Sequence, residues 1–159
     1  MIRFYRANPS STGCCGTFYV NGQGNIMMKF VKQAGYDGRA GDFKSNSKNP
    51  EKNAIVKLSR VEAGGIIDCI ENNVDYSFDH FSDTQTTSVK FGNANQDDSG
   101  LPKNYSIAVF KTIKDSKKKV NFSMYLERGE ARLLIEELKR FIYETALVTG
   151  YSSQDQNAR

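Results

Sequence analysis

Few residues in this chain of 159 could carry out acid, base, nucleophilic or metal chemistry. The sequence has one histidine, His80, next to Asp79, and three cysteines, of which Cys14 and Cys15 are adjacent and Cys69 stands alone. A lone histidine beside an aspartate on a strand is usually structural, and no second cysteine pair stands at the spacing of a zinc site. No glycine-rich phosphate loop lies between a strand and a helix. We therefore expect no enzyme: no catalytic residues, no metal and no cofactor.

Lysine and tyrosine residues alternate with apolar residues along several strand-like segments. Near the end of the chain, Val120, Phe122 and Met124 fall on one side of a strand, and Ser123 and Tyr125 fall on the other. Successive side chains of a strand point to opposite faces, so each such strand has an apolar and a polar face. If helices cover the apolar faces, the open faces and one long loop present these candidate contacts: Tyr19, Lys29, Lys44, Lys48, Lys57, Lys90 and Tyr125.

These cations and rings have the chemistry that binds single-stranded nucleic acid. Lysines neutralise phosphates and release counterions, and aromatic rings stack on exposed bases of any identity. The alternative is that these residues only solvate an antiparallel sheet, since the formal net charge is just +4. The same alternative applies to the lysines that crowd another segment, namely Lys111, Lys114, Lys117, Lys118 and Lys119.

The remaining aromatic residues divide into core and loop positions. Of Phe4 and Tyr5, only one can face the core of an extended strand. Tyr36 and Phe43 lie in a loop, where they either cover a bound strand or pin the loop to the sheet. Phenylalanines with apolar neighbours are expected in the core, and they are Phe4, Phe30, Phe78, Phe91, Phe110, Phe122 and Phe141.

Two helices are expected, each directly after a strand. Residues 58–70 and 126–138 share Leu, Arg, Glu, Ala and Ile at five equivalent positions, which indicates a duplicated unit, although these residue types are also common at unrelated helix starts. Ser59 and Glu62 form a capping-box pattern. Gly64 and Gly65 in the same helix indicate close packing of another group. The apolar stripe of the second helix is expected to end at Gly150.

The strands complete an α+β fold with the order ββββα-ββββα. We expect two antiparallel four-stranded sheets packed through two helices, in one domain of residues 1–150 with halves of about 1–73 and 74–150 and a disordered tail at 151–159. Long loops are expected at 35–53 and 93–104. The expected strands are 2–6, 17–20, 26–32, 54–58, 74–81, 87–91, 105–113 and 119–125.

This arrangement resembles the Whirly family of single-stranded DNA-binding proteins, which is related to the transcription coactivator positive cofactor 4. The segment from Val56 to Gly64 is similar to the family's passage from a strand into the first helix, and Ser77-Phe78-Asp79-His80 is similar to the stretch that follows. The Lys-Gly-Lys-Ala-Ala signature of the plant members is absent. The resemblance covers about residues 1–148 and fits a viral or bacterial relative better than a plant one.

The resemblance implies a non-catalytic protein that coats single-stranded DNA during replication, recombination or repair, as a dimer or tetramer joined through its helices. RNA binding or annealing, transcription coactivation, and a protein-interaction module without nucleic-acid binding are the alternatives. No apolar run is long enough to cross a membrane and no signal peptide opens the chain. Three cysteines that form no efficient disulfide framework indicate a reducing intracellular compartment, namely the cytoplasm or nucleoid, or the host cytoplasm for a viral protein.

Overall fold

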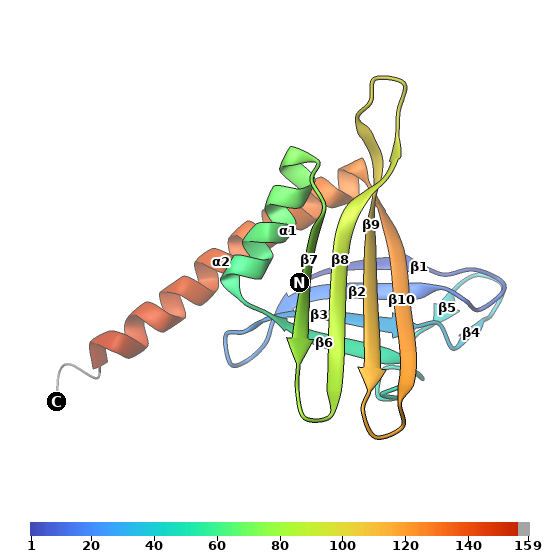
Figure 1. Cartoon of the computed structure of the whole chain (residues 1–159), viewed down its shortest axis with the longest axis horizontal. Coiled ribbons are helices and arrows are strands. Elements are labelled where there is room, and N and C mark those ends of the chain that lie inside the picture. Colours follow the sequence, from blue (N-terminus) through green and yellow to red (C-terminus); the bar gives the residue numbers. More distant parts are fainter. Residues whose placement is uncertain (156–159) are drawn as a thin grey trace.

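Two antiparallel sheets, each followed by a helix, make up the chain (Figure 1). The computed structural model describes the backbone of residues 1–155 and the side chains of residues 1–147. The α+β class, the two helices and the antiparallel sheets that we expected are confirmed. None of the helices in the described part of the chain is both long and apolar enough to cross a membrane.

The first half contains one four-stranded sheet with the order β1-β2-β3-β6. Its strands are β1 (Ile2–Arg6), β2 (Cys14–Val20), β3 (Ile26–Lys32) and β6 (Asn53–Leu58), and helix α1 (Arg60–Asn72) follows. The long loop expected at 35–53 contains a small hairpin of its own, made by β4 (Gly35–Tyr36) and β5 (Gly41–Asp42). The sequence pattern gave no sign of this hairpin because each of its strands has only two residues.

The second half repeats the meander and the helix. Its sheet has the order β10-β9-β8-β7. The strands are β7 (Tyr76–Phe81), β8 (Gln85–Gln96), β9 (Pro102–Ile113) and β10 (Lys118–Glu127), and helix α2 (Arg128–Asp155) closes the chain. The two halves thus have the same order of four main strands and a helix, with the β4–β5 hairpin added to the first.

Two predicted boundaries in the second half are wrong. Strands β8 and β9 run through most of the segment expected to be a loop at 93–104 and project beyond the sheet as an arm (Figure 1). Where the arm turns, the Arg128 guanidinium lies 2.7 Å from an Asp97 carboxylate oxygen and donates to the Pro102 carbonyl. Helix α2 continues past Gly150 to Asp155, so the predicted tail begins inside the helix, and its residues 156–159 lie outside the described part.

The inner faces of the two sheets pack directly on each other. The rings of Phe30 on β3 and Phe122 on β10 lie 6.5 Å apart between centroids. Gly16 on β2 makes room for Met124, whose sulfur would lie 2.6 Å from an added Cβ. The expected packing through helices alone is therefore incomplete. The helices α1 and α2 contact each other and lie together at one end of the sheets, so the outer sheet faces stay clear of them (Figure 1).

Helix α1 begins and packs as its sequence indicates. The Ser59 hydroxyl accepts a hydrogen bond from the Glu62 N–H, and the Glu62 carboxylate accepts one from the Ser59 N–H, which completes the capping box. Of the two helical glycines, only Gly65 makes a close contact. A Cβ there would lie 2.3 Å from Cζ of the Tyr76 ring on β7, whereas a Cβ at Gly64 would meet nothing within 4 Å.

Candidate nucleic-acid interface

The sequence-derived candidate contacts fall on two separate surfaces. Tyr19, Lys29 and Lys57 lie on the outer face of the first sheet. Lys90 and Tyr125 lie on the outer face of the second sheet. The remaining two candidates, Lys44 and Lys48, are exposed in the segment between β5 and β6. The alternation of buried and exposed residues thus assigns the sheet faces as expected, but the structure does not bring the seven residues into one site.

The outer face of the second sheet contains an aromatic platform that we expected in the core. Phe110 on β9 is 46% exposed, and the Lys90 ammonium lies 5.9 Å from its ring centroid. Small or polar residues flank this ring on the neighbouring strands, with Ser88 and Asn121 directly opposite. A ring beside a cation and free of bulky neighbours can stack on a base while the cation contacts a phosphate.

Other aromatic residues extend this face. Tyr125 on the edge strand β10 is 58% exposed, and Phe81 at the end of β7 is 76% exposed. Phe81 was not among the predicted contacts. The signal for Phe110 and Phe81 was present in the alternation, since Val109 and Lys111 are buried on either side of Phe110. The apolar neighbours of Phe110 in the sequence therefore led to a wrong prediction, because their side chains point to the opposite face of the sheet.

The other phenylalanines expected in the core lie there. Phe78 is half-buried against the core, and the rest are buried, namely Phe4, Phe30, Phe91, Phe122 and Phe141. Tyr5 is the exposed partner of buried Phe4, as the alternation required. Lys111 differs from the other lysines of its segment, because its ammonium is buried and donates to the carbonyls of Pro50 and Asn53 at 2.8 and 3.3 Å. Burial lowers the pKa of Lys111.

The outer face of the first sheet is more polar and is partly covered. Tyr19, Met27 and Lys57 form one row across β2, β3 and β6, and Lys29 lies in the next row beside exposed Ile55. The segment after β5 covers the other end of this face through Phe43, whose ring lies 5.7 Å from that of Tyr5. Phe43 is buried, so it pins the loop to the sheet, whereas Tyr36 is exposed.

Arg3 and Tyr5 of β1 also lie on this face, although neither was predicted to be a contact. The Arg3 side chain donates from Nε to the Thr17 hydroxyl at 3.1 Å and from Nη1 to the Tyr5 hydroxyl at 2.9 Å. Its guanidinium also lies 5.9 Å from the Tyr5 ring centroid. The strand β1 was expected, and its exposed side could have been assigned from the same alternation. Arg3 and Tyr5 therefore belong with Lys29 and Lys44.

The single histidine contacts a helix-capping residue, and the cysteines are buried. His80 Nε2 lies 2.7 Å from Oε1 of Glu62, the capping residue of α1. Burial raises the pKa of the Cys14 thiol to about 12 and that of Cys69 to about 11, so both thiols stay protonated at neutral pH. Within residues described by the structure, no cluster of three His, Cys, Asp or Glu residues is placed to hold a metal ion.

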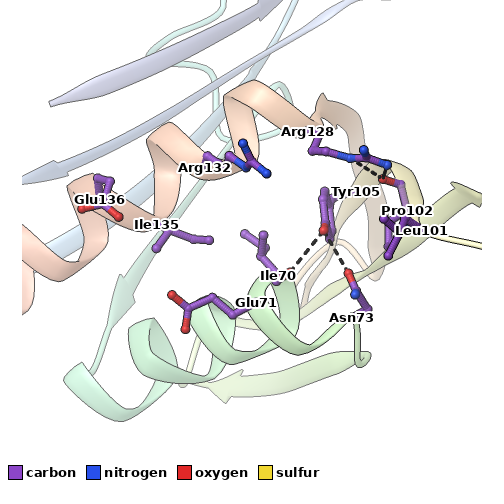
Figure 2. Close-up of a pocket in the computed structure, with 10 residues that line it drawn as sticks. All are labelled: Ile70, Glu71, Asn73, Leu101, Pro102, Tyr105, Arg128, Arg132, Ile135 and Glu136. Carbon is purple, nitrogen blue, oxygen red and sulfur yellow. Dashed lines mark hydrogen bonds between the residues drawn. The ribbon is translucent and has the colours of Figure 1, made fainter. Parts of the chain in front are cut away.

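A further pocket of about 370 Å³ lies on the helix side, between the two helices and the base of the β8–β9 arm (Figure 2). Inside it the Tyr105 hydroxyl donates to the Ile70 carbonyl at 3.1 Å and to the Asn73 side chain at 3.0 Å. Glu71 and Glu136 line the same pocket as Arg128 and Arg132, so the charges offset one another. This pocket therefore lacks the cationic excess that a polyanion requires.

The fold has counterparts among solved structures. WHY1 from Arabidopsis thaliana superposes with a TM-score of 0.66 at 12% identity, over 99% of this chain and 90% of that one. The chain has a Whirly-like fold. MRP1/MRP2 from Trypanosoma brucei gives a TM-score of 0.67 at 14% identity over 95% and 86% of the two chains. A guide-RNA-binding protein complex bound to a guide RNA gives 0.62 at 12% identity over 91% and 90%.

The Whirly-like fold is found through shape rather than through sequence. No protein-family model matches the chain. No curated protein matches it either. The plant transcriptional regulator PBF-2 shares the fold at 13% identity, with a TM-score of 0.65 over 99% of this chain and 86% of that one. At such identities the similarity establishes the common architecture alone.

Proposed function

We propose that this protein binds single-stranded DNA with little dependence on sequence and acts by binding alone, without catalysis. The observation that carries the proposal is the Phe110 ring beside Lys90 on a sheet face that no helix covers. Stacking on an aromatic ring contributes about 1–3 kcal/mol per base and accepts any base. Tyr125 and Phe81 add exposed rings to the same face, and Tyr19, Lys29 and Lys57 supply contacts on the other sheet.

Sequence-tolerant contacts suit a protein that coats unwound DNA. Unpaired strands arise during DNA replication, recombination and repair, and we propose a role in one of these processes. The solved structure of WHY1 supports the fold on which this proposal rests. Transcription is the alternative role, because the plant transcriptional regulator PBF-2 has the same fold. A pull-down that recovers RNA polymerase would favour transcription over coating of unwound DNA.

The deciding experiment is fluorescence anisotropy with a labelled thymidine oligomer, titrated with salt. We expect binding that weakens linearly on a logarithmic scale of salt concentration, with a slope of about −0.7 for each phosphate contacted. Absence of binding even at low salt would contradict the proposal and would favour a protein-interaction module whose lysines only solvate the sheets. Replacement of Lys90 by Gln should reduce the slope by about 0.7.

RNA is the second candidate ligand, and one specific observation favours it. A guide-RNA-binding protein complex bound to a guide RNA shares this fold. A deoxyribose and a ribose oligomer of one sequence, compared at one salt concentration, would distinguish the two ligands, because contacts to the 2′-hydroxyl favour RNA. Equal affinity would indicate contacts to phosphates and bases only.

We also propose that the chain assembles into dimers or tetramers through its helices. Several large apolar side chains are exposed on the helices, namely Val61, Leu133, Tyr143 and Leu147. Burial of such groups against a second copy removes apolar surface from water. Light scattering coupled to gel filtration would measure the assembly, and a monomer at micromolar concentration would contradict it.

The two halves of the fold support descent from a duplicated ββββα unit. In each half a glutamate at the same position of the repeat accepts a hydrogen bond from the backbone at the helix start. Glu62 accepts from the Ser59 N–H at 2.7 Å, and Glu130 accepts from the Glu127 N–H at 2.9 Å.

A further inference from the structure

A cavity lies beneath the β4–β5 hairpin, on the outer face of the first sheet. Its volume is about 450 Å³, which falls within the range of about 300–1,000 Å³ typical of small-molecule sites. Strands β1, β2 and β3 form its floor, and the segment from Gly41 to Ser47 forms its roof. The outer face of the second sheet has a pocket of about 430 Å³, which is lined by strands β7, β8 and β9 and by Asp75 rather than by a separate covering segment.

The roof of this cavity is fixed to the sheet. The Asp42 carbonyl accepts from the Ala34 N–H at 2.7 Å, and the Asn46 side chain donates to the Lys32 carbonyl at 3.0 Å. Buried Gln33 fixes the preceding strand β4, because its side chain accepts from the N–H groups of Asn8 and Gly13 and donates to the carbonyls of Asn8 and Gly35. Gly41 approaches the start of the chain so closely that an added Cβ would lie 2.7 Å from Cβ of Ala7. A cavity with a fixed roof is present before a ligand arrives, so binding costs little ordering.

Three cations converge on the cavity without acidic partners. Arg3 and Lys29 come from the floor, and Lys44 comes from the roof. Within residues described by the structure, no carboxylate forms an ion pair with any of the three, although nine such pairs occur elsewhere. Asp42 also lines the cavity, and its carboxylate, which accepts from the N–H groups of Lys44 and Ser45, offsets one of the three positive charges. The cavity therefore retains an excess of positive charge.

The part of the lining next to Arg3 is aromatic and apolar. Tyr5 is 53% exposed there, and its ring packs against buried Phe43. Cys15 and Val31 form a small buried cluster with Phe43 beneath the roof. Cations beside an aromatic ring match a nucleotide, whose phosphate is anionic and whose base is flat and apolar on its faces.

We propose that this cavity takes up one nucleotide of a bound strand, with its phosphate at Arg3, Lys29 and Lys44 and its base against Tyr5. The inference rests on the proposed function and adds a specific subsite to it. The two sheets then differ in their contribution. The first holds a nucleotide in a pocket that the segment after β5 partly covers and that three cations line, whereas the second holds a base against Phe110 in a hollow formed by its own strands.

Photo-crosslinking of the full chain tests the two surfaces separately. Thymidine oligomers carrying one 5-iodo-deoxyuridine are bound, irradiated and mapped by mass spectrometry. We expect crosslinked peptides containing Tyr5 or Phe43 and others containing Phe110. The double substitution K29Q/K44Q should remove the first set, keep the second, and reduce the salt slope of binding by about 0.7, since the contact to one phosphate is lost.

Lys52→Gln is the matched control, because Lys52 is an exposed lysine of the same segment that does not line the cavity. It should leave crosslinks and salt slope unchanged. Crosslinks at Phe110 without any at Tyr5 or Phe43 would overturn the subsite and leave the proposed function standing. The subsite is also overturned if K52Q changes binding as much as K29Q or K44Q alone. An absence of oligomer binding at low salt would overturn both.

Discussion

The Nε2 atom of His80 lies 2.7 Å from Oε1 of Glu62, and this contact joins the edge strand β7 to the first turn of α1. The other oxygen of the same carboxylate accepts from the Ser59 N–H. One glutamate therefore caps the helix of the first half and also attaches it to the first strand of the second half.

The second half makes an equivalent connection to the first half. Glu130, which occupies the equivalent position in α2, accepts from the Glu127 N–H and pairs with Arg6 at the end of β1. Each helix is thus tied by its first-turn glutamate to the opening strand of the other half. The shared glutamate of the sequence repeat has a structural role, because it locks the two halves together.

Replacing Glu62 by alanine should destabilise the protein by about 1–2 kcal/mol at neutral pH, because the cap and the contact to His80 are both lost. Burial tends to raise the pKa of Glu62, but the hydrogen bonds from Ser59 and His80 outweigh it and the pKa is lowered. A carboxylate with a lowered folded-state pKa stabilises the fold fully above its unfolded-state pKa, and this contribution is lost as the pH falls through the folded-state pKa.

The difference in the free energy of unfolding between the E62A variant and the wild type should therefore become smaller under acidic conditions. Urea unfolding at a series of pH values measures this difference. Glu127→Ala is the control, because the Glu127 side chain is exposed and only its backbone takes part in the α2 cap. A difference that is equally large in acid would contradict the role assigned to the charged carboxylate.

The two adjacent glycines of α1 should respond in opposite directions to alanine. Gly64→Ala meets no neighbour and should stabilise the protein by up to about 1 kcal/mol through helix propensity. Gly65→Ala would push against the Tyr76 ring and should destabilise by about 1–3 kcal/mol. Thermal unfolding followed by circular dichroism compares the two variants directly. Equal shifts in the melting temperature would show that the Tyr76 ring can accommodate a side chain at position 65.

Phe110→Ala should weaken binding of a thymidine oligomer by about 1–3 kcal/mol, which is the contribution of one stacked base. Fluorescence anisotropy at constant salt measures the loss. The ring is half exposed and makes no core contact, so the variant should keep its thermal stability. Val74→Ala shortens an exposed apolar side chain between α1 and β7, in none of the proposed contact surfaces, and serves as the control. Equal losses in both variants would argue against a platform on the sheet.

Gln33→Leu should destabilise the fold and loosen the β4–β5 hairpin. The change leaves two N–H groups and two carbonyls without the side chain that now satisfies them. Each buried group without a partner costs about 1–3 kcal/mol, so the total should exceed about 2 kcal/mol. Chemical denaturation measures this, with Gln23→Leu at the exposed β2–β3 turn as the control. A destabilisation no larger than that of Q23L would contradict the structural role assigned to the Gln33 side chain.

Much of the fold was predictable because alternation and turn chemistry are local signals. The strands Ile2–Arg6 and Ile26–Lys32 have the bounds that the sequence indicated, and the Ser59 cap is where the pattern placed it. The buried sides of β8 and β10 also follow the alternation. These features depend on neighbours within a few residues, which a single sequence displays.

The features that the sequence did not reveal depend on tertiary contacts. Lys111 is buried because its ammonium donates to the Pro50 and Asn53 carbonyls. These partners are distant in the sequence, so no local pattern predicts them. The β8–β9 arm is stabilised by Arg128 of helix α2, which pairs with Asp97 of the arm. The cavity beneath the hairpin likewise unites Arg3 with Lys44, which are distant in sequence.

The inner faces of the two sheets meet, so their outer faces point away from each other (Figure 1). Any polymer that touches both must turn around a rim of the molecule. Duplex DNA has a persistence length of about 50 nm and resists such a turn at this scale. An unpaired chain is far more pliable and wraps at small cost. If the protein binds nucleic acid as proposed, back-to-back packing would therefore favour unpaired strands over duplex without any contact that identifies a base.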